Sequence, residues 1–197
     1  MREDEKAGKM EKVRSFIALE LSDEAREEFA RITAVLKRAD ADVKWVSSGS
    51  IHLTLKFLGY ISEEKILPVA ERLRDLARGK TPFEIILDSI GVFPGWDRAR
   101  ALWIGLGMGS DRVKDLAGEV EDVMYREGFE KEKRSFRSHL TLGRIKSSKN
   151  RDKLEKAASL AEVNPVVSNI SKIVLFRSDL TSKGALYTPI ETAGFRG

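Results

Sequence analysis

Apolar and polar residues alternate in two stretches of this chain that share the tetrapeptide His-Leu-Thr-Leu, at 52–55 and again at 139–142. Successive side chains of an extended strand point to opposite faces, so this alternation predicts strands with one face on the interior. In the first stretch we expect Ile51, Leu53, Leu55 and Phe57 on the interior face, and His52, Thr54 and Lys56 on a face that lines a cleft.

The remaining pattern predicts helices and strands in alternation. Apolar residues at helical spacing indicate helices that begin at Ser22, Ser62, Ser110 and Asn150, of which the second carries Pro68 and should kink or restart there. Further strands are expected at 13–21, 44–46, 83–92, 101–106, 170–176 and 185–190, and the two motif strands at 51–58 and 138–145.

This order of elements favours an α+β fold, and the repeated motif divides it into two pseudo-symmetric lobes. Residues 1–12 are rich in charge and poor in apolar side chains, so we expect a flexible N-terminal extension, within which Met10 is a candidate start. Residues 13–197 are expected to form a single bilobal domain.

Composition narrows the class of protein. The chain of 197 residues has no cysteine, which excludes disulfides and thiolate chemistry. No apolar stretch approaches the length of a membrane span and no signal peptide precedes residue 13, so we expect a cytoplasmic location. The net charge of +4, from 35 basic and 31 acidic residues, favours contact with a few phosphates over the wrapping of a long duplex.

His52 and His139 are the only histidines of the chain, and each begins one of the two motifs. Imidazole titrates near neutral pH, so one copy can accept a proton while the other donates one, an arrangement suited to attack on a phosphate ester. Thr54 and Thr141 share the face of the neighbouring histidine and can donate to phosphate oxygens. Arg144 is a candidate phosphate ligand, but strict alternation places it opposite His139 unless a bulge near Gly143 redirects it.

Other candidate features are weaker. Lys56 shares the predicted face of His52 but is typical of a solvated charge. Aromatic residues that could stack on a base are left outside the site, because core packing accounts for them: Trp45, Trp96, Trp103, Tyr60 and Tyr187. No phosphate-binding Walker loop is present. A metal site is disfavoured, since no carboxylate lies on the motif strands.

Several stretches together resemble one family, the RNA 2′,3′-cyclic phosphodiesterases, or 2′-5′ RNA ligases, of the two-histidine phosphoesterase superfamily (LigT-like). The similar stretches span most of the chain: 14–19, 52–59, 91–94, 101–105, 136–144 and 175–187. One departure is Ser138, where the family usually has proline before the second histidine. Proline there would preset the backbone without taking part in the reaction.

The resemblance implies two antiparallel sheets, each with helices on its outer face, on either side of a central cleft that carries the two His-x-Thr motifs. It also implies hydrolysis of RNA 2′,3′-cyclic phosphate ends to 2′-phosphates, with His52 as general acid and His139 as general base. Thr54, Thr141 and Arg144 would bind the phosphate, reversal would give a 2′-5′ linkage, and neither direction would need a metal, ATP or another cofactor. Expected partners are RNA ends, such as tRNA fragments, or small nucleotides, bound by a monomer.

Two alternatives remain open at this point. The same histidines could cleave linear 2′-5′ oligonucleotides or small cyclic nucleotides, which substrate length would separate from RNA ends. The chain could also be a binding module for RNA or nucleotides that lacks turnover.

Overall fold

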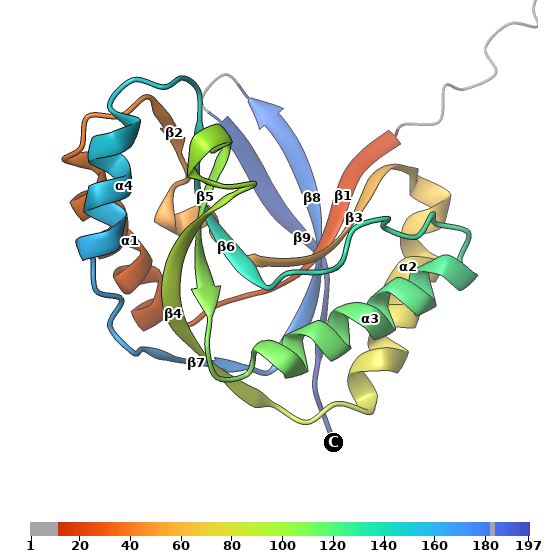
Figure 1. The fold of residues 1–197 in the computed structure, drawn as a ribbon. Helices are drawn as coiled ribbons and strands as arrows, with labels where there is room; N and C mark the ends of the chain where they lie inside the picture. Colours follow the sequence, from red (N-terminus) through yellow and green to blue (C-terminus); the bar gives the residue numbers. More distant parts are fainter. Residues whose placement is uncertain (1–11, 182–183) are drawn as a thin grey trace, which may run out of the picture.

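Two antiparallel sheets form the centre of the protein in a computed structural model that describes residues 12–181 and 184–197 (Figure 1). The first sheet has the order β3-β1-β8-β9, with β3 at Leu53–Ser62, β1 at Lys12–Leu19, β8 at Lys172–Thr181 and β9 at Gly184–Gly194. The second has the order β2-β6-β5-β4-β7, with β2 at Val43–Trp45, β6 at His139–Ile145, β5 at Ala101–Leu106, β4 at Phe83–Phe93 and β7 at Val167–Ile170. The predicted α+β class is confirmed.

Four helices in the described residues cover these sheets, two on each (Figure 1). Helices α2 (Glu63–Arg78) and α3 (Ser110–Arg126) pack on the first sheet, whereas α1 (Asp23–Lys37) and α4 (Arg151–Leu160) pack on the second. The apolar stripe of each helix meets the apolar face of its sheet, so both sheets and all four helices share one continuous core. No helix of the described residues is long and apolar enough to cross a membrane.

The two halves of the chain exchange a helix. Helix α1 follows β1 of the first sheet, yet it packs beside α4 and β7 of the second half. Helix α3 follows β5 of the second sheet, yet it packs against β3 and α2 of the first. The order strand, crossing helix, motif strand, helix therefore occurs twice, as β1-α1-β3-α2 and as β5-α3-β6-α4, which is the pseudo-symmetry that the repeated motif predicted.

Several boundaries differ from the prediction. The residue that caps the start of α3 is Gly109, at a φ of +79°, and not the predicted Ser110. Glycine fits at this position because a Cβ atom there would lie 2.3 Å from the Glu84 carbonyl oxygen. Helix α2 runs through Pro68 without a restart. Strand β7 was not predicted, and β1 begins at Lys12, inside the expected extension. The rest of that extension, Met10 included, lies outside the described residues.

Candidate active site

Both His-Leu-Thr-Leu motifs contain a register shift at the same position. On β3, Thr54 pairs with Ala18 and Lys56 with Ile17, which leaves Leu55 without a partner on β1. On β6, Thr141 pairs with Trp103 and Gly143 with Leu102, which leaves Leu142 without a partner on β5. A β-bulge of this kind reverses the facing of the residues that follow it. On β3 a second shift leaves Leu58 without a partner and reverses the facing again, so that Tyr60 pairs with Arg14.

The bulge corrects two expectations for the first motif. Lys56 does not share the face of His52: its side chain is buried on the helix side, where Nζ donates to Oε1 of Glu121 on α3 at 2.6 Å and to the Glu130 carbonyl at 2.9 Å. Phe57 lies on the opposite face to the one predicted. It is 62% exposed, and its ring is 5.9 Å from that of Phe16 on β1. Regular alternation gives the wrong face for both residues.

The equivalent bulge brings Arg144 to the face of His139. Arg144 pairs with Ala101 and Thr141 with Trp103, two positions that share one face of β5. The charge of Arg144 also contributes to lowering the pKa of His139, so the guanidinium acts on that imidazole. We call the face that carries His139, Thr141 and Arg144, together with the face that carries Thr54, Phe16 and Phe57, the motif faces of the two sheets.

His52 stands directly before β3, against an aromatic cluster of the first motif face. Its ring centroid is 4.5 Å from that of Phe16 and 4.9 Å from that of Tyr187, which meets it edge-on. Nδ1 is 3.0 Å from the Ser50 carbonyl. Burial lowers the pKa of His52 to about 4, and the charge of Arg26 acts in the same direction.

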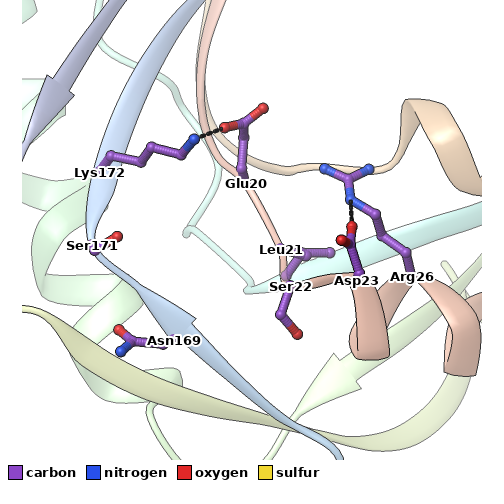
Figure 2. Close-up of a pocket in the computed structure, with 8 residues that line it drawn as sticks. All are labelled: Glu20, Leu21, Ser22, Asp23, Arg26, Asn169, Ser171 and Lys172. Carbon is purple, nitrogen blue, oxygen red and sulfur yellow. Dashed lines mark ion pairs between the residues drawn. The ribbon is translucent and has the colours of Figure 1, made fainter.

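Arg26, in the first turns of α1, connects the helix to the loop that precedes His52. Its Nη1 donates to the carbonyls of Ser48 and Ile51 at 3.4 and 3.3 Å, and its Nε is 4.0 Å from the Asp23 carboxylate. Arg26 also lines a polar cavity of about 280 Å³, in which Glu20 pairs with Lys172 (Figure 2). Neither histidine lines this cavity.

His139 begins β6 and has a similar local environment. Nδ1 is 2.7 Å from the Arg137 carbonyl, and the ring meets Phe93 edge-on at 5.1 Å. Burial, and then the charge of Arg144, lower the pKa of His139. Ser138, the departure noted in the sequence, has its hydroxyl 2.7 Å from that of Ser110 at the start of α3. A hydrogen bond to the crossing helix therefore holds the residue before this histidine.

The hydrogen bonds at Nδ1 determine which ring nitrogen carries the proton in each neutral imidazole. A carbonyl oxygen only accepts, so Nδ1 of His52 and of His139 must donate. In the neutral state each Nε2 then has a free lone pair, which can accept a proton, and in the charged state each Nε2 carries a proton that it can donate. The two motifs thus present the same nitrogen of the ring for proton transfer.

The two motif strands belong to different sheets but lie side by side, with β3 next to β6 in the middle of the molecule (Figure 1). The site expected from the sequence included none of the aromatic residues that contact the histidines, which are Phe16, Phe93, Phe176 and Tyr187. Tyr187 was considered and set aside, and no signal in the sequence singled out Arg26. No group of three or more metal-ligating side chains occurs in the described residues.

Comparisons with known proteins match both of the stretches that carry a motif. The LigT like phosphoesterase family model matches residues 19–103 and 106–187, and each stretch contains one motif. An RNA 2′,3′-cyclic phosphodiesterase of Methanothermobacter thermautotrophicus is 39% identical over 181 residues, covering 91% of this chain and 97% of that protein. Another, of Aquifex aeolicus, is 34% identical over 185 residues, covering 92% and 97%.

Solved structures show the same fold. A crystal structure of a protein from Thermus thermophilus has a TM-score of 0.77 at 26% identity and covers 93% of this chain and 98% of its own. Apo LigT of Escherichia coli has a TM-score of 0.76 at 24% identity, covering 95% and 99%. From the matched motifs, the relatives and the fold together, the chain belongs to the LigT-like phosphoesterases, the family of the RNA 2′,3′-cyclic phosphodiesterases.

Proposed function

We propose that this protein hydrolyses the 2′,3′-cyclic phosphate end of RNA to a 2′-phosphate, by proton transfer between substrate, water and two histidines. The observation that carries the proposal is the matched pair of imidazoles, each with Nδ1 held by a backbone carbonyl and Nε2 available. Relatives that share up to 39% of their residues with this chain are named for this activity. Reversal by a 5′-hydroxyl would form a 2′-5′ linkage.

In the proposed reaction Nε2 of His139 removes a proton from water, and the resulting hydroxide attacks phosphorus. The bond from phosphorus to the 3′ oxygen breaks, and that oxygen takes the proton carried by Nε2 of His52. Thr54 and Thr141 donate hydrogen bonds to the phosphate oxygens, while Arg144 stabilises the negative charge that develops on them. The ring of Phe57, exposed on the first motif face, supports the terminal base.

The low pKa of His52 is consistent with an acid role once substrate is bound. In the free protein, burial keeps its imidazole mostly neutral at pH 7. A cyclic phosphate diester brings one negative charge next to the ring, and an opposite charge within a few ångströms favours the protonated imidazole. Binding of the substrate therefore raises the pKa of His52 and loads the acid for the reaction.

The direct test incubates EDTA-treated protein with a short RNA that ends in a 2′,3′-cyclic phosphate and identifies the position of the phosphate in the product. We expect a 2′-phosphate, formed at the same rate with and without EDTA. His52→Ala and His139→Ala should each lose roughly 100- to 10,000-fold in rate, the usual contribution of one proton transfer. A 3′-phosphate product, or rates close to wild type in either variant, would contradict the proposal.

A substrate with sulfur in place of the bridging 3′ oxygen separates the two roles. A thiol ionises near pH 8.5, far below an alcohol, so the departing thiolate needs no acid. His52→Ala should recover most of its rate on this substrate, whereas His139→Ala should not. Recovery in His139→Ala alone would exchange the two assignments.

We also propose that the protein acts as a monomer on RNA ends, without a metal or other cofactor. The cytoplasmic location expected from the sequence stays a prediction.

A further inference from the structure

The first motif face continues beyond His52 and Thr54 as a regular series of rows across β3, β1 and β8. The registers of the three strands, and the bond between Arg14 and Ser178, define these rows as Thr54 with Ala18 and Val174, then Phe57 with Phe16 and Phe176, then Tyr60 with Arg14 and Ser178. Lys12, paired with Ser62, follows Arg14 on the same face of β1. The rows therefore lead from Thr54, the proposed phosphate ligand, to a row of phenylalanines, and then to Tyr60 beside the basic Arg14.

The third row combines an exposed ring with a positioned cation. Tyr60 is 65% exposed although it is a large aromatic residue on a strand. Arg14 is only partly exposed, and its Nη1 donates to the buried hydroxyl of Ser178 at 2.5 Å. No carboxylate of the described residues forms an ion pair with Arg14 or Lys12. The face at Tyr60 is thus positively charged and carries an uncovered ring, in continuity with the site.

We propose that Tyr60 and Arg14 form a second nucleotide subsite, which binds the nucleotide on the 5′ side of the cyclic end. Tyr60 stacks on its base, and Arg14 contacts the phosphate that links it to the terminal nucleoside. The inference rests on the proposed function, because the cyclic phosphate at Thr54 sets the direction of the chain. The cyclic phosphate is the 3′ end of the RNA, so the only direction in which the RNA continues is 5′.

The spacing of the rows fits this assignment. Arg14 lies four residues from Ala18 along β1, which corresponds to roughly 13 Å at about 3.3 Å per residue. A nucleoside held by its phosphate at Thr54 with its base on Phe57 occupies the first two rows and leaves the third uncovered. The next nucleotide of an extended chain is the first group that can reach Tyr60.

The test compares kcat/KM for a nucleoside 2′,3′-cyclic phosphate with kcat/KM for the dinucleotide that has the same end. Stacking of one base typically raises affinity by roughly 5- to 150-fold, so we expect the wild type to prefer the dinucleotide by on the order of ten-fold. Tyr60→Ala should remove this preference and leave the mononucleotide rate unchanged, whereas Tyr60→Phe should keep it. Arg14→Gln should reduce it and lower the salt dependence of dinucleotide binding by about one counterion.

Tyr125→Ala, at an exposed tyrosine in the last turn of α3, and Arg38→Gln, at the exposed arginine that follows α1, serve as matched controls and should behave like wild type. Equal wild-type rates on the two substrates would overturn the subsite, as would equal losses on both in Tyr60→Ala or loss of the preference in Tyr60→Phe. If wild type cleaves neither substrate, the proposed function fails. Dinucleotide affinity then still decides on the subsite, which is overturned if wild type and Tyr60→Ala bind equally.

Discussion

At the scale of single residues, the two histidines differ in how strongly the protein disfavours their charged form. His52 is packed against Phe16 and Tyr187, and burial lowers its pKa to about 4. The pKa of His139 is lowered by the same cause, with help from Arg144. The reaction needs a charged His52 and a neutral His139, whereas between the two pKa values most of the free protein has the opposite arrangement. The reactive form is a minority there, but its fraction is still largest between the two pKa values.

We therefore expect kcat/KM, which reports on the free enzyme, to peak between about pH 4 and 6.5. The kcat optimum should lie at higher pH, because the bound phosphate raises the pKa of the acid. Arg26→Gln removes a positive charge that lowers the pKa of His52, so the kcat/KM optimum should move toward neutral pH. The check is a pair of pH profiles for each protein, with chemistry shown to be rate-limiting.

Arg38→Gln, at the other end of α1, is the control for this change and should leave both profiles in place. An Arg26→Gln profile that loses height without moving would show that Arg26 acts only through the shape of the Ser48–Ile51 loop.

The sequence was enough to name the residues of the candidate site, but it was not enough to decide to which face of the strand every neighbouring side chain points. His52, His139 and the two threonines could be named because the same tetrapeptide occurs twice. The faces of Lys56 and Phe57 could not, because a bulge depends on which residues of the neighbouring strand find partners. For Arg144 the bulge near Gly143 was foreseen as the condition, and the structure contains it.

At the scale of elements, the bulge on β3 gives Lys56 a buried structural role in place of the solvated position expected from the sequence. Its side chain is 4% exposed and bridges β3 to α3 through Glu121, whose side chain is 21% exposed. The carbonyl of Glu130 accepts a second hydrogen bond from the same ammonium group. This ion pair therefore links β3 to α3, the helix that crosses over from the second half of the chain.

Removal of one partner should cost more than removal of both. Glu121→Leu leaves a buried, uncompensated charge, for which we expect a loss of about 3 kcal/mol in the free energy of unfolding. Lys56→Met with Glu121→Leu should recover most of this loss, because no charge remains buried. Chemical denaturation of the four proteins in the double-mutant cycle measures both effects.

The exposed pair between Asp122 on α3 and Lys131, in the segment after that helix, provides the control. Lys131→Met should cost less than about 1 kcal/mol, as is usual for a solvated ion pair. A double variant that is less stable than Glu121→Leu would show that the buried pair stabilises the protein in its own right.

Element types followed from the sequence more reliably than element ends. The Ser22 cap was predicted and is present, with its hydroxyl 3.3 Å from the amide of Ala25. Strand β7 was missed because its four residues are too short to show a period, and it forms only by pairing with β4. Tertiary pairing, which a local pattern does not contain, decides such short elements.

At the scale of the whole molecule, charge is spread in both signs over the surface. The 35 basic residues are nearly balanced by 31 acidic ones, and many of them form ion pairs with each other. A long basic track for RNA is therefore not expected. The cations that the two proposals place at or beside phosphates are few: Arg144, Arg14 and, next to Arg14 on the same face, Lys12.

Binding of an oligonucleotide to His52→Ala, measured across a salt series, tests this picture. Release of about three counterions corresponds to a slope of roughly −2 for the logarithm of affinity against the logarithm of salt, since a single strand gives about −0.7 for each. A slope that indicates on the order of six or more released counterions would show an extended RNA track instead.

The exchange of α1 and α3 between the halves also bears on how such a protein can be assembled. A half-chain that ended before β5 would keep α1 with only β2 and β4 of the sheet it covers, and its own sheet would lack α3, β8 and β9. It would expose apolar surface at both places unless a second half-chain supplied the missing parts. Two copies of a half-chain could supply each other, each lending its crossing helix to the other. A fused tandem of one ancestral unit would then inherit its two histidines from a former subunit interface.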